Sequence, residues 1–545
     1  MCPRPLPQVF RGRRPRAMRH AARATTAWPV GPSVPALCGW ISARSASVAA
    51  AAPNSNDSAA EGSYEYALNE KNMSQKLRSM EYAVRGLVPK RAEELEARLR
   101  AGEQLPFKHI TYAHNGNPQK VGQAPITFFR QVLALCDLPP EHGLDHAMAT
   151  SLFPKDAIAR ARRLHAAIGE GGTGAYTHSQ GVPALRQDVA DFVGERDGFA
   201  AEKDHFYLTS GASSAIQMLL TAVVNSEEDA VLIPIPQYPL YSATLALLGA
   251  HQAGYQLDEA QGWAVTTEGL RASFDASRAR GHKPRACVII NPGNPTGQVF
   301  SREALQSVIR FCIEERLVLL ADEVYQENVY GTHQFVSARQ AALEMGAEAE
   351  RLELVSFHST SKGFVGECGR RGGYMQLHNI DPYVESQLFK LASSKLCSGV
   401  SGQALTSLMV RPPVRGDESY ELYAAEAGAI KEALSAKAQL LVDGLNSIDG
   451  FTCNDAQGSM YAYPAVRVPD RAWAAAAERG ISVDVLYALS LLETTGVCVV
   501  PASGFGQAAG RAGFRTTFLP SAGDLEMAVE QFRRHHEIFC AQYGD

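Results

Sequence analysis

Between residues 204 and 377, short apolar runs rich in β-branched residues alternate with stretches of helical spacing. This alternation predicts an α/β fold in which a mostly parallel sheet is covered by helices on both faces. Such sheets bind ligands at the carboxyl ends of their strands, so the residues after each run are the first candidates for a functional site. The predicted strands are residues 206–208, 230–235, 287–290, 317–321 and 354–358, and the clearest helices are residues 213–225 and 301–315.

The sequence on either side of this region has a different pattern. Residues 80–104 carry a Glu/Arg/Leu pattern that predicts one helix. Beyond about residue 398 the pattern is helical and then mixed, which indicates a second, smaller α+β domain. The predicted division is a transit peptide and linker at 1–60, an N-terminal arm contributing to the small domain at 61–150, a large domain at 151–400 and a small C-terminal domain at 401–545.

The first 56 residues contain eight arginines but no lysine and no carboxylate, and they are rich in Ala, Ser and Pro. This composition is typical of organelle transit peptides that are removed on import. We therefore expect a protein of the mitochondrial matrix, with the plastid as the alternative destination. A solvated basic tail is the simpler interpretation of the same residues.

The rest of the chain, with those eight arginines set aside, holds 44 basic and 57 acidic residues. A nucleic-acid partner would need a compensating basic stripe, and the sequence shows none. No apolar run has the length of a membrane span. We expect neither a nucleic-acid nor a membrane partner.

The ten cysteines are scattered without a metal-binding spacing, and we interpret them as reduced, mostly structural thiols. His535 and His536 lie in a terminal helical stretch without a metal-binding order, and we expect them on a solvated helix face. The sequence therefore predicts no metal site.

Small residues follow the first predicted strand and open a helix. Gly211 and Ala212 would leave backbone N–H groups free to hold a phosphate at the helix N-terminus, and Ser213 would add a hydroxyl. An ordinary helix N-cap explains the same residues equally well.

Three later strands are followed by other polar groups. A rigid turn with two X-Pro bonds would position Asn294. Asp322 and Tyr325 place a carboxylate and a phenol after the next strand. The last predicted strand is followed by two serines and a lysine, Ser359, Ser361 and Lys362. Two arginines, Arg370 and Arg371, come shortly after them.

A lone lysine is normally a solvated charge, but this combination matches pyridoxal phosphate group by group. The phosphate needs a helix N-terminus and a cation, the pyridine nitrogen needs a buried carboxylate, and the aldehyde needs an amine. Lys362 would bind the aldehyde and Asp322 the ring nitrogen. Tyr325 and Asn294 would bind the phenolic oxygen, and Tyr238 would stack on the ring.

From about Ile110 to the C-terminus, the sequence resembles the fold-type-I, class-I aminotransferases, which depend on pyridoxal phosphate, and among them the alanine aminotransferase family. Each matching segment by itself is modest evidence for the family, but all of them together, in this order, are specific to it. The segments are residues 115–118 (NGNP), 174–176 (GAY), 233–244 (IPIPQYPLYSAT), 291–298 (NPGNPTGQ), 321–325 (ADEVY), 356–363 (SFHSTSKG) and 499–507 (VVPASGFGQ).

The resemblance implies further site residues. Arg515 would pair bidentately with the substrate α-carboxylate, and the Gly116 backbone and Asn294 would complete that site. Tyr176 would reach the phosphate of a partner subunit, which implies a homodimer with shared active sites. The chain departs from the family where Arg370 replaces a common aromatic residue. The flanking glycines favour Arg371 as the phosphate ligand, with Arg370 as the fallback.

The activity that the resemblance implies is reversible ping-pong transfer of an amino group between L-alanine/pyruvate and L-glutamate/2-oxoglutarate, with Lys362 as the catalytic residue. A glutamate (or alanine):glyoxylate aminotransferase is the nearest alternative. Ser359 and Lys362 also satisfy the S-x-x-K pattern of serine hydrolases, but the companion S-D-N and K-T-G elements are missing downstream. A silent structural homologue would have lost the lysine or Asp322. No residue in the sequence identifies the site for the distal carboxylate of glutamate.

Overall fold

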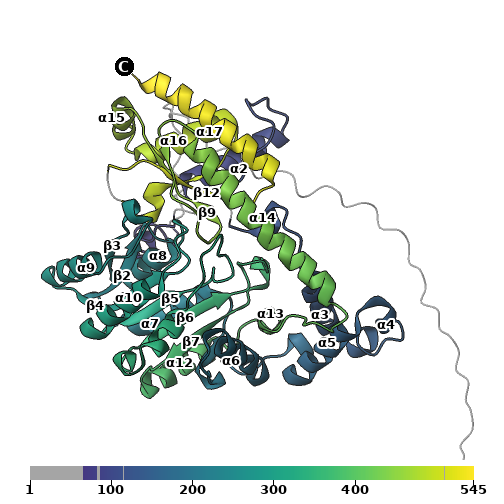
Figure 1. Cartoon of the computed structure of the whole chain (residues 1–545). Helices are drawn as coiled ribbons and strands as arrows, with labels where there is room; N and C mark the ends of the chain where they lie inside the picture. The colour runs from purple at the N-terminus through teal and green to yellow at the C-terminus, as the bar shows by residue number, and fades with distance from the viewer. Residues whose placement is uncertain (1–65, 83–85, 115, 508–509, 545) are drawn as a thin grey trace, which may run out of the picture. The chain divides into compact units, whose positions relative to one another are not determined.

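A seven-stranded sheet in the order β1-β7-β6-β5-β4-β2-β3 forms the framework of the protein (Figure 1). In the computed structural model, residues 66–82, 86–114, 116–507 and 510–544 are described. The strands are β1 (Phe206–Leu208), β2 (Asp229–Ile235), β3 (His251–Gln256), β4 (Lys283–Ile290), β5 (Val318–Asp322), β6 (Leu354–Ser359) and β7 (Gly373–His378). Strands β3, β2, β4, β5 and β6 run parallel to one another, whereas β7 is antiparallel to both β6 and β1. The predicted, mostly parallel sheet is therefore confirmed.

The five strands predicted from apolar runs are all present, but the sequence pattern missed β3 and β7. Strand β3 lies at the edge of the sheet, where only Ala253 and Tyr255 are buried and polar residues alternate with them. Strand β7 is interrupted by polar Gln376, which is nonetheless buried. Neither strand has the continuous apolar run on which the prediction relied.

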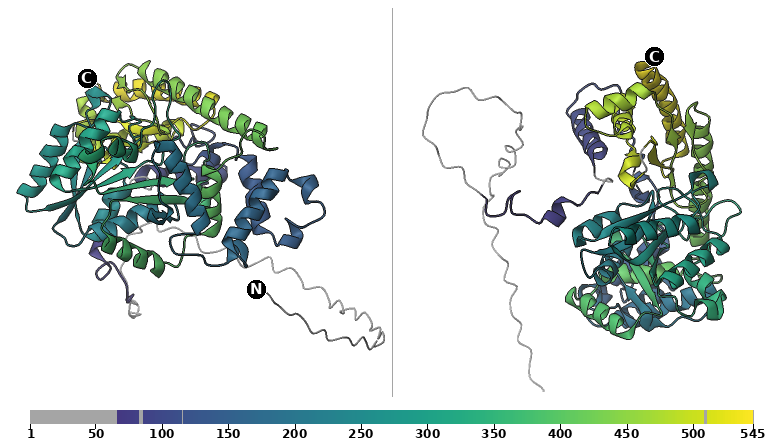
Figure 2. Two further views of the ribbon diagram at one scale, coloured as in Figure 1. Left: turned by 60° about the horizontal axis from the view of Figure 1, so that its bottom comes forward. Right: turned by 90° about the vertical axis from the view of Figure 1, so that its left-hand side faces the viewer.

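Helices cover both faces of the sheet, as Figures 1 and 2 show. Side chains alternate across β2, so Val231 and Ile233 belong to one core cluster and Leu232 to another. The first cluster includes residues of α7 (Ala212–Val223), α8 (Leu240–Leu248) and α12 (Pro382–Ser394). The second includes residues of α9 (Thr267–Ala279), α10 (Arg302–Glu315) and α11 (Ala338–Glu344). This is the predicted arrangement of covered faces.

A third apolar cluster surrounds the end of the sheet at β1 and β7. Phe206 and Tyr374 from these strands pack there edge to face, with ring centroids 6.0 Å apart. The surrounding helices are α3 (Thr127–Asp137), α4 (Ala149–Leu152), α5 (Lys155–Ile168), α6 (Pro183–Asp197) and α13 (Val400–Val410).

The C-terminal segment adds two small sheets and several helices. Helices α14 (Tyr420–Asn446) and α17 (Ala522–Tyr543) pack side by side in Figure 1. A three-stranded sheet in the order β11-β12-β9 lies in the same segment. The remaining elements are β8 (Phe451–Thr452), β9 (Tyr461–Ala462), β10 (Ala465–Val466), α15 (Asp470–Glu478), α16 (Val483–Thr495), β11 (Val500–Pro501) and β12 (Phe514–Thr517).

The N-terminal arm packs on this C-terminal segment. Helix α2 (Leu87–Arg100) contacts α16, and Thr111 forms a bridge with Val497. The predicted helix at 80–104 is too long at both ends: it begins after Gly86 and ends before Gly102, whose φ of +88° is left-handed. A separate short helix, α1 (Gln75–Arg78), precedes it.

Residues 68–545 form one compact unit, and the predicted domain boundary near residue 400 stays a prediction. The predicted transit peptide lies outside the described residues, as does Asn115. Within the described part of the chain, no helix is long and apolar enough to cross a membrane.

The prediction that His535 and His536 lie on a solvated face is wrong. Their exposed fractions are 1% and 6%, because α17 turns this side toward the core, where the His535 and His536 rings contact Tyr487. Burial lowers the pKa of His535 to about 4, so the ring is neutral at physiological pH. The described residues contain no group of three or more His, Cys, Asp or Glu side chains that could hold a metal ion.

Candidate active site

A cavity of about 400 Å³ lies where the strands of the large sheet end. The register places Ile290, Asp322 and Phe357 level with one another at the ends of β4, β5 and β6. Side chains after these strands therefore meet at one edge, as expected for parallel strands. The predicted site residues that line the cavity are Gly116, Ala212, Ser213, Tyr238, Asn294, Asp322, Tyr325, Ser359, Ser361, Lys362, Arg371 and Arg515.

The N-terminus of α7 forms one end of the cavity. Gly211 precedes the helix with a φ of +78° and provides no side-chain cap, so the first-turn N–H groups are not capped by a side chain. Arg371 donates from Nη2 to the Ser210 carbonyl at 3.0 Å and to Ser213 Oγ at 3.3 Å. A Cβ atom on Gly211 would lie 2.5 Å from the same Nη2, so Arg371 would have to move, and the positive φ by itself favours glycine. Arg371, and not Arg370, lines the cavity.

Asp322 is buried at the base of the cavity. Its Oδ2 accepts a hydrogen bond from Tyr241 Oη at 3.0 Å, whereas its Oδ1 is buried without a hydrogen-bond partner. Burial raises the pKa of Asp322 to about 6, although the Tyr241 hydroxyl, the Val324 backbone N–H and the Lys362 ammonium act in the opposite direction. An N–H donor that entered the cavity would satisfy Oδ1 and stabilise the ionised carboxylate.

Arg515 is almost completely buried, with an exposed fraction of 2%. Its Nη1 donates to Asn294 Oδ1 at 3.0 Å and its Nη2 to the His114 carbonyl at 3.2 Å. Its Nε is buried without a partner. Asn294 in turn donates from Nδ2 to Tyr325 Oη at 3.4 Å. The guanidinium is thus fixed by two protein oxygens, and the Nε N–H is among the donors that remain without a protein partner.

Lys362 extends into the same cavity from the loop after β6. Its Nζ donates to the Gly116 carbonyl at 2.8 Å and lies 5.6 Å from the centre of the Tyr325 ring. The next residue, Gly363, has a φ of +66°, and its N–H donates to Asn328 Oδ1 at 2.8 Å. This turn fixes the direction in which Lys362 leaves the strand.

Eight residues line the cavity that were not predicted as site residues: Tyr82, Asn117, Ile216, Leu240, Ile290, Val324, Cys368 and Tyr461. Tyr82 shares a hydrogen bond of 2.7 Å between its hydroxyl and that of Tyr238. Tyr241, which binds Asp322, lies in the first turn of α8, three residues after Tyr238, and it was not predicted as a site residue. The pairing of β9 with β12 brings Tyr461 to the site, and no local sequence pattern predicts this pairing.

Tyr176 does not line the cavity of its own chain. Its side chain is 78% exposed. The same surface carries Phe389 and Leu396, which are also exposed, and the His178 ring stacks on Phe389 at 5.4 Å.

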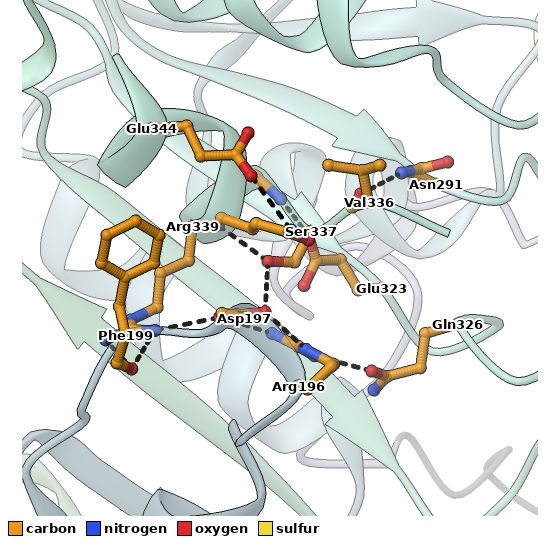
Figure 3. Close-up of polar contacts among 12 residues, drawn as sticks. Arg196, Asp197, Phe199, Asn291, Glu323, Gln326, Val336, Ser337, Arg339 and Glu344 are labelled. Carbon is orange, nitrogen blue, oxygen red and sulfur yellow. Dashed lines mark hydrogen bonds and ion pairs between the residues drawn. The ribbon is translucent and has the colours of Figure 1, made fainter. Parts of the chain in front are cut away.

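A buried charge network supports the loop that follows Asp322 (Figure 3). Asp197 accepts hydrogen bonds from Arg196 at 2.7 Å, Ser337 at 2.9 Å and Arg339 at 3.0 Å. Burial by itself raises the pKa of Asp197, but these donors outweigh it and lower the pKa. Glu323 Oε1 accepts from the Ala338 N–H at 2.7 Å, and burial raises the pKa of Glu323 to about 7. The network therefore holds both ends of residues 323–338 without lining the cavity.

Comparison with known proteins identifies the family. Residues 146–532 match the family model described as aminotransferase class I and II. The chain is 47% identical to human alanine aminotransferase 1 over 87% of this chain and 95% of the relative. It is 45% identical to a probable mitochondrial alanine aminotransferase of Dictyostelium discoideum (87% and 89% covered) and 41% identical to glutamate–glyoxylate aminotransferase 2 of Arabidopsis thaliana (88% and 98% covered).

Solved structures agree on the fold. An Escherichia coli aminotransferase superposes with a TM-score of 0.67 at 24% identity, covering 86% of this chain and 98% of its own. An alanine aminotransferase from Pyrococcus furiosus gives a TM-score of 0.66 at 21% identity, covering 85% and 99%. With this fold, and with a family match over most of its length, the chain belongs to the class I and II aminotransferases.

Proposed function

We propose that this protein uses pyridoxal phosphate to transfer an amino group reversibly between L-alanine and 2-oxoglutarate. The observation that carries the proposal is the set of groups around one cavity: an amine, a buried carboxylate and a buried guanidinium, from Lys362, Asp322 and Arg515. The last two each keep one buried polar atom without a partner, Oδ1 and Nε. The relatives named alanine aminotransferases support this choice of substrate.

The residues of the cavity fit the proposed cofactor. The α7 N-terminus, Ser213, Ser359, Ser361 and Arg371 would hold the phosphate, with Gly211 and Ala212 contributing backbone N–H groups. Asp322 Oδ1 would accept the ring N–H, and Tyr325 with Asn294 would bind the phenolic oxygen. Tyr238 would stack on the ring. Pyridoxal phosphate, when bound, supplies an aldehyde for the amino group and a protonated ring that accepts electrons from Cα.

The chain's own residues would then carry out three tasks. Arg515, with the Gly116 backbone and Asn294, binds the α-carboxylate and so orients Cα. The Lys362 amine would move the proton from the substrate Cα to the cofactor carbon that receives the amino group. Asp322 keeps the ring nitrogen protonated. The amino group stays in the site until a second oxo acid receives it, which makes the kinetics ping-pong.

A glyoxylate-using enzyme is the second candidate, because relatives named glutamate–glyoxylate aminotransferases match nearly the whole chain. A steady-state comparison of pyruvate, glyoxylate and 2-oxoglutarate as acceptors, with alanine and glutamate as donors, distinguishes the two. We expect the highest kcat/KM with the alanine and 2-oxoglutarate pair. A higher kcat/KM for glyoxylate than for 2-oxoglutarate would reassign the function.

The serine-hydrolase alternative finds no support in the geometry. Lys362 Nζ donates to the Gly116 carbonyl, and the Ser359 hydroxyl accepts from the Ser361 N–H at 3.4 Å. No described contact joins the lysine to the serine as a base and its nucleophile.

A homodimer with shared active sites is part of the proposal. The exposed Tyr176 is available to a partner's phosphate site, and the apolar side chains of Phe389 and Leu396 beside it would be covered by the same contact.

We also propose that the transit peptide and linker at residues 1–60 direct the chain to mitochondria, where the transit peptide is removed. Relatives named as mitochondrial support this destination over the plastid. Import of the full chain into isolated mitochondria, followed by N-terminal sequencing, tests it. We expect a new N-terminus between residues 43 and 63. Processing by chloroplasts and not by mitochondria would overturn the assignment.

A further inference from the structure

Tyr461 lies between the two cations that face the substrate in the proposed function, and the fold places it there by strand pairing. In the sheet of β9 and β12, Tyr461 is paired with Thr517. Arg515 lies two residues before Thr517 and therefore on the same face of the strand. The two side chains are diagonal neighbours, and the Arg515 guanidinium lies 4.0 Å from the centre of the Tyr461 ring.

The contact between ring and guanidinium is buried. Tyr461 is 3% exposed, and the Phe505 ring lies 4.8 Å from the same guanidinium. Cation–π attraction is strongest where water is excluded, so these rings hold the guanidinium in place. Arg515 has no carboxylate partner among the described contacts, and its hydrogen bonds go to neutral oxygens.

The hydroxyl of Tyr461 lies close to Gly116, whose carbonyl accepts from the Lys362 amine. Tyr325 Oη donates to Tyr461 Oη at 3.4 Å. A Cβ atom on Gly116 would overlap the Tyr461 hydroxyl and would lie 3.1 Å from Lys362 Nζ. The hydroxyl and the amine thus flank the same glycine, which is why that position has room for no side chain.

The electrostatic setting makes the Tyr461 oxygen a good acceptor. Burial raises the pKa of the Tyr461 phenol, but the Lys362 and Arg515 cations and the hydrogen bond from Tyr325 outweigh burial and lower it. The pKa of Tyr325 shifts the other way: burial raises it, so the Tyr325 phenol keeps its proton. Of the two phenols, Tyr461 is therefore the one whose oxygen accepts.

We propose that Tyr461 is a positioning residue with two separable parts, a ring that holds the Arg515 guanidinium for the substrate carboxylate and a hydroxyl oxygen that holds the Lys362 amine for proton transfer. This inference rests on the proposed function of the site. The Tyr461 side chain alone would then align the Lys362 amine with the substrate carboxylate.

Two substitutions separate the parts. Tyr461→Phe keeps the ring and removes the oxygen, so we expect kcat with L-alanine to fall about 10-fold or more while its KM stays within about twofold. Tyr461→Leu removes the ring, so we expect the dissociation constant of propionate, a carboxylate that cannot react, to rise about 10-fold as well. An unchanged kcat in Tyr461→Phe, or equal propionate affinity in Tyr461→Leu and wild type, would overturn the proposal.

A double-mutant cycle provides a readout that does not depend on turnover. Gly116→Ala should lower the Tm of the cofactor-loaded enzyme, because its Cβ displaces the Tyr461 hydroxyl. The same substitution should lower the Tm less in the Tyr461→Phe background, where the obstructing oxygen is gone. Additive losses would show that the hydroxyl does not occupy this position. This cycle stays informative if Tyr461→Leu fails to fold.

The matched control is Tyr463→Phe, which removes a buried tyrosine hydroxyl from the segment beside β9 but outside the cavity. Its Oη donates to the Ala502 carbonyl at 3.3 Å. We expect kcat and propionate affinity like those of wild type. If wild type itself shows no transamination, the proposed function has failed. If wild type is active and Tyr461→Phe matches it, only the role of Tyr461 has failed.

Discussion

At the scale of single residues, the site places ionisable groups where water cannot reach them. Asp322 is the clearest case, because its folded-state pKa of about 6 lies above the value of about 4 for an unfolded aspartate. The native state therefore keeps this proton where the unfolded state has lost it. Stability is lost as pH rises from about 4 to about 6, and the loss persists above that range. The ionised Asp322 carboxylate therefore lowers the stability of the cofactor-free protein, and a hydrogen-bond donor at Oδ1 would offset this loss.

We predict that Asp322→Asn stabilises the cofactor-free protein at pH 8 by up to about 3 kcal/mol, because Asn avoids the buried charge. The gain should disappear near pH 4, and the variant should lose most of its transaminase activity. Denaturant unfolding of both proteins at the two pH values measures the difference. Equal effects at pH 8 and pH 4 would mean that the buried charge is not the cause.

Glu323→Gln is the matched control for this comparison. Glu323 is also buried, with a pKa of about 7, but it does not line the cavity. Gln can still accept from the Ala338 N–H. We expect a similar pH-dependent gain in stability with the activity retained.

For Arg515 we predict that Arg515→Lys raises KM for L-alanine about 10-fold or more while the cofactor stays bound. Lysine cannot reproduce a bidentate pair, and its compact charge is more costly to bury. Steady-state kinetics and the absorbance of the bound cofactor give the two readouts. Arg511→Lys is the control, since Arg511 pairs with Glu259 outside the cavity. An unchanged KM in Arg515→Lys would remove Arg515 from the carboxylate site.

At the scale of elements, the N-terminus of α7 depends on Gly211. We predict that Gly211→Ala weakens cofactor binding at least 10-fold, because the added Cβ displaces Arg371 from the phosphate position. Equilibrium titration of the cofactor-free protein measures this affinity.

Gly169→Ala is the control for backbone strain. Gly169 has a comparable φ of +94°, but a Cβ there meets no atom within 4 Å. Both variants should lose stability, of the order of 1–3 kcal/mol, and only Gly211→Ala should lose cofactor affinity. Equal affinity losses would attribute the effect to strain.

Local sequence pattern predicted the strands that have a continuous apolar run, whether they lie inside the sheet or at its edge. The five predicted strands are β1, β2, β4, β5 and β6, and the polar residues that follow three of them identified Asn294, Asp322 and Lys362. Edge strand β3 and reversed strand β7 lack such runs, so the pattern did not reveal them. The core-facing side of α17 was also missed, because only its packing against neighbouring helices buries His535. Tyr461 depends on pairing between β9 and β12, which are distant in sequence.

At the scale of the whole molecule, the proposed dimer divides each active site between two chains. A subunit with Tyr176→Ala keeps Lys362 but cannot serve its partner's phosphate, whereas a Lys362→Ala subunit keeps Tyr176. We predict that each variant is impaired alone. Co-expression in equal amounts should restore about a quarter of the wild-type activity, because half the dimers are mixed and each has one intact site. No recovery would place Tyr176 outside the partner's site.

The central claim is that Lys362, Asp322 and Arg515 form one transaminating site. The half-reaction tests it most directly: cofactor-loaded protein is mixed with L-alanine in the absence of any oxo acid, and the pyruvate released is counted. We predict about one pyruvate per subunit for the wild type, then no more until 2-oxoglutarate is added. Lys362→Ala should release none in the same time. Absence of pyruvate from the wild type, or an equal release by Lys362→Ala, would contradict the claim.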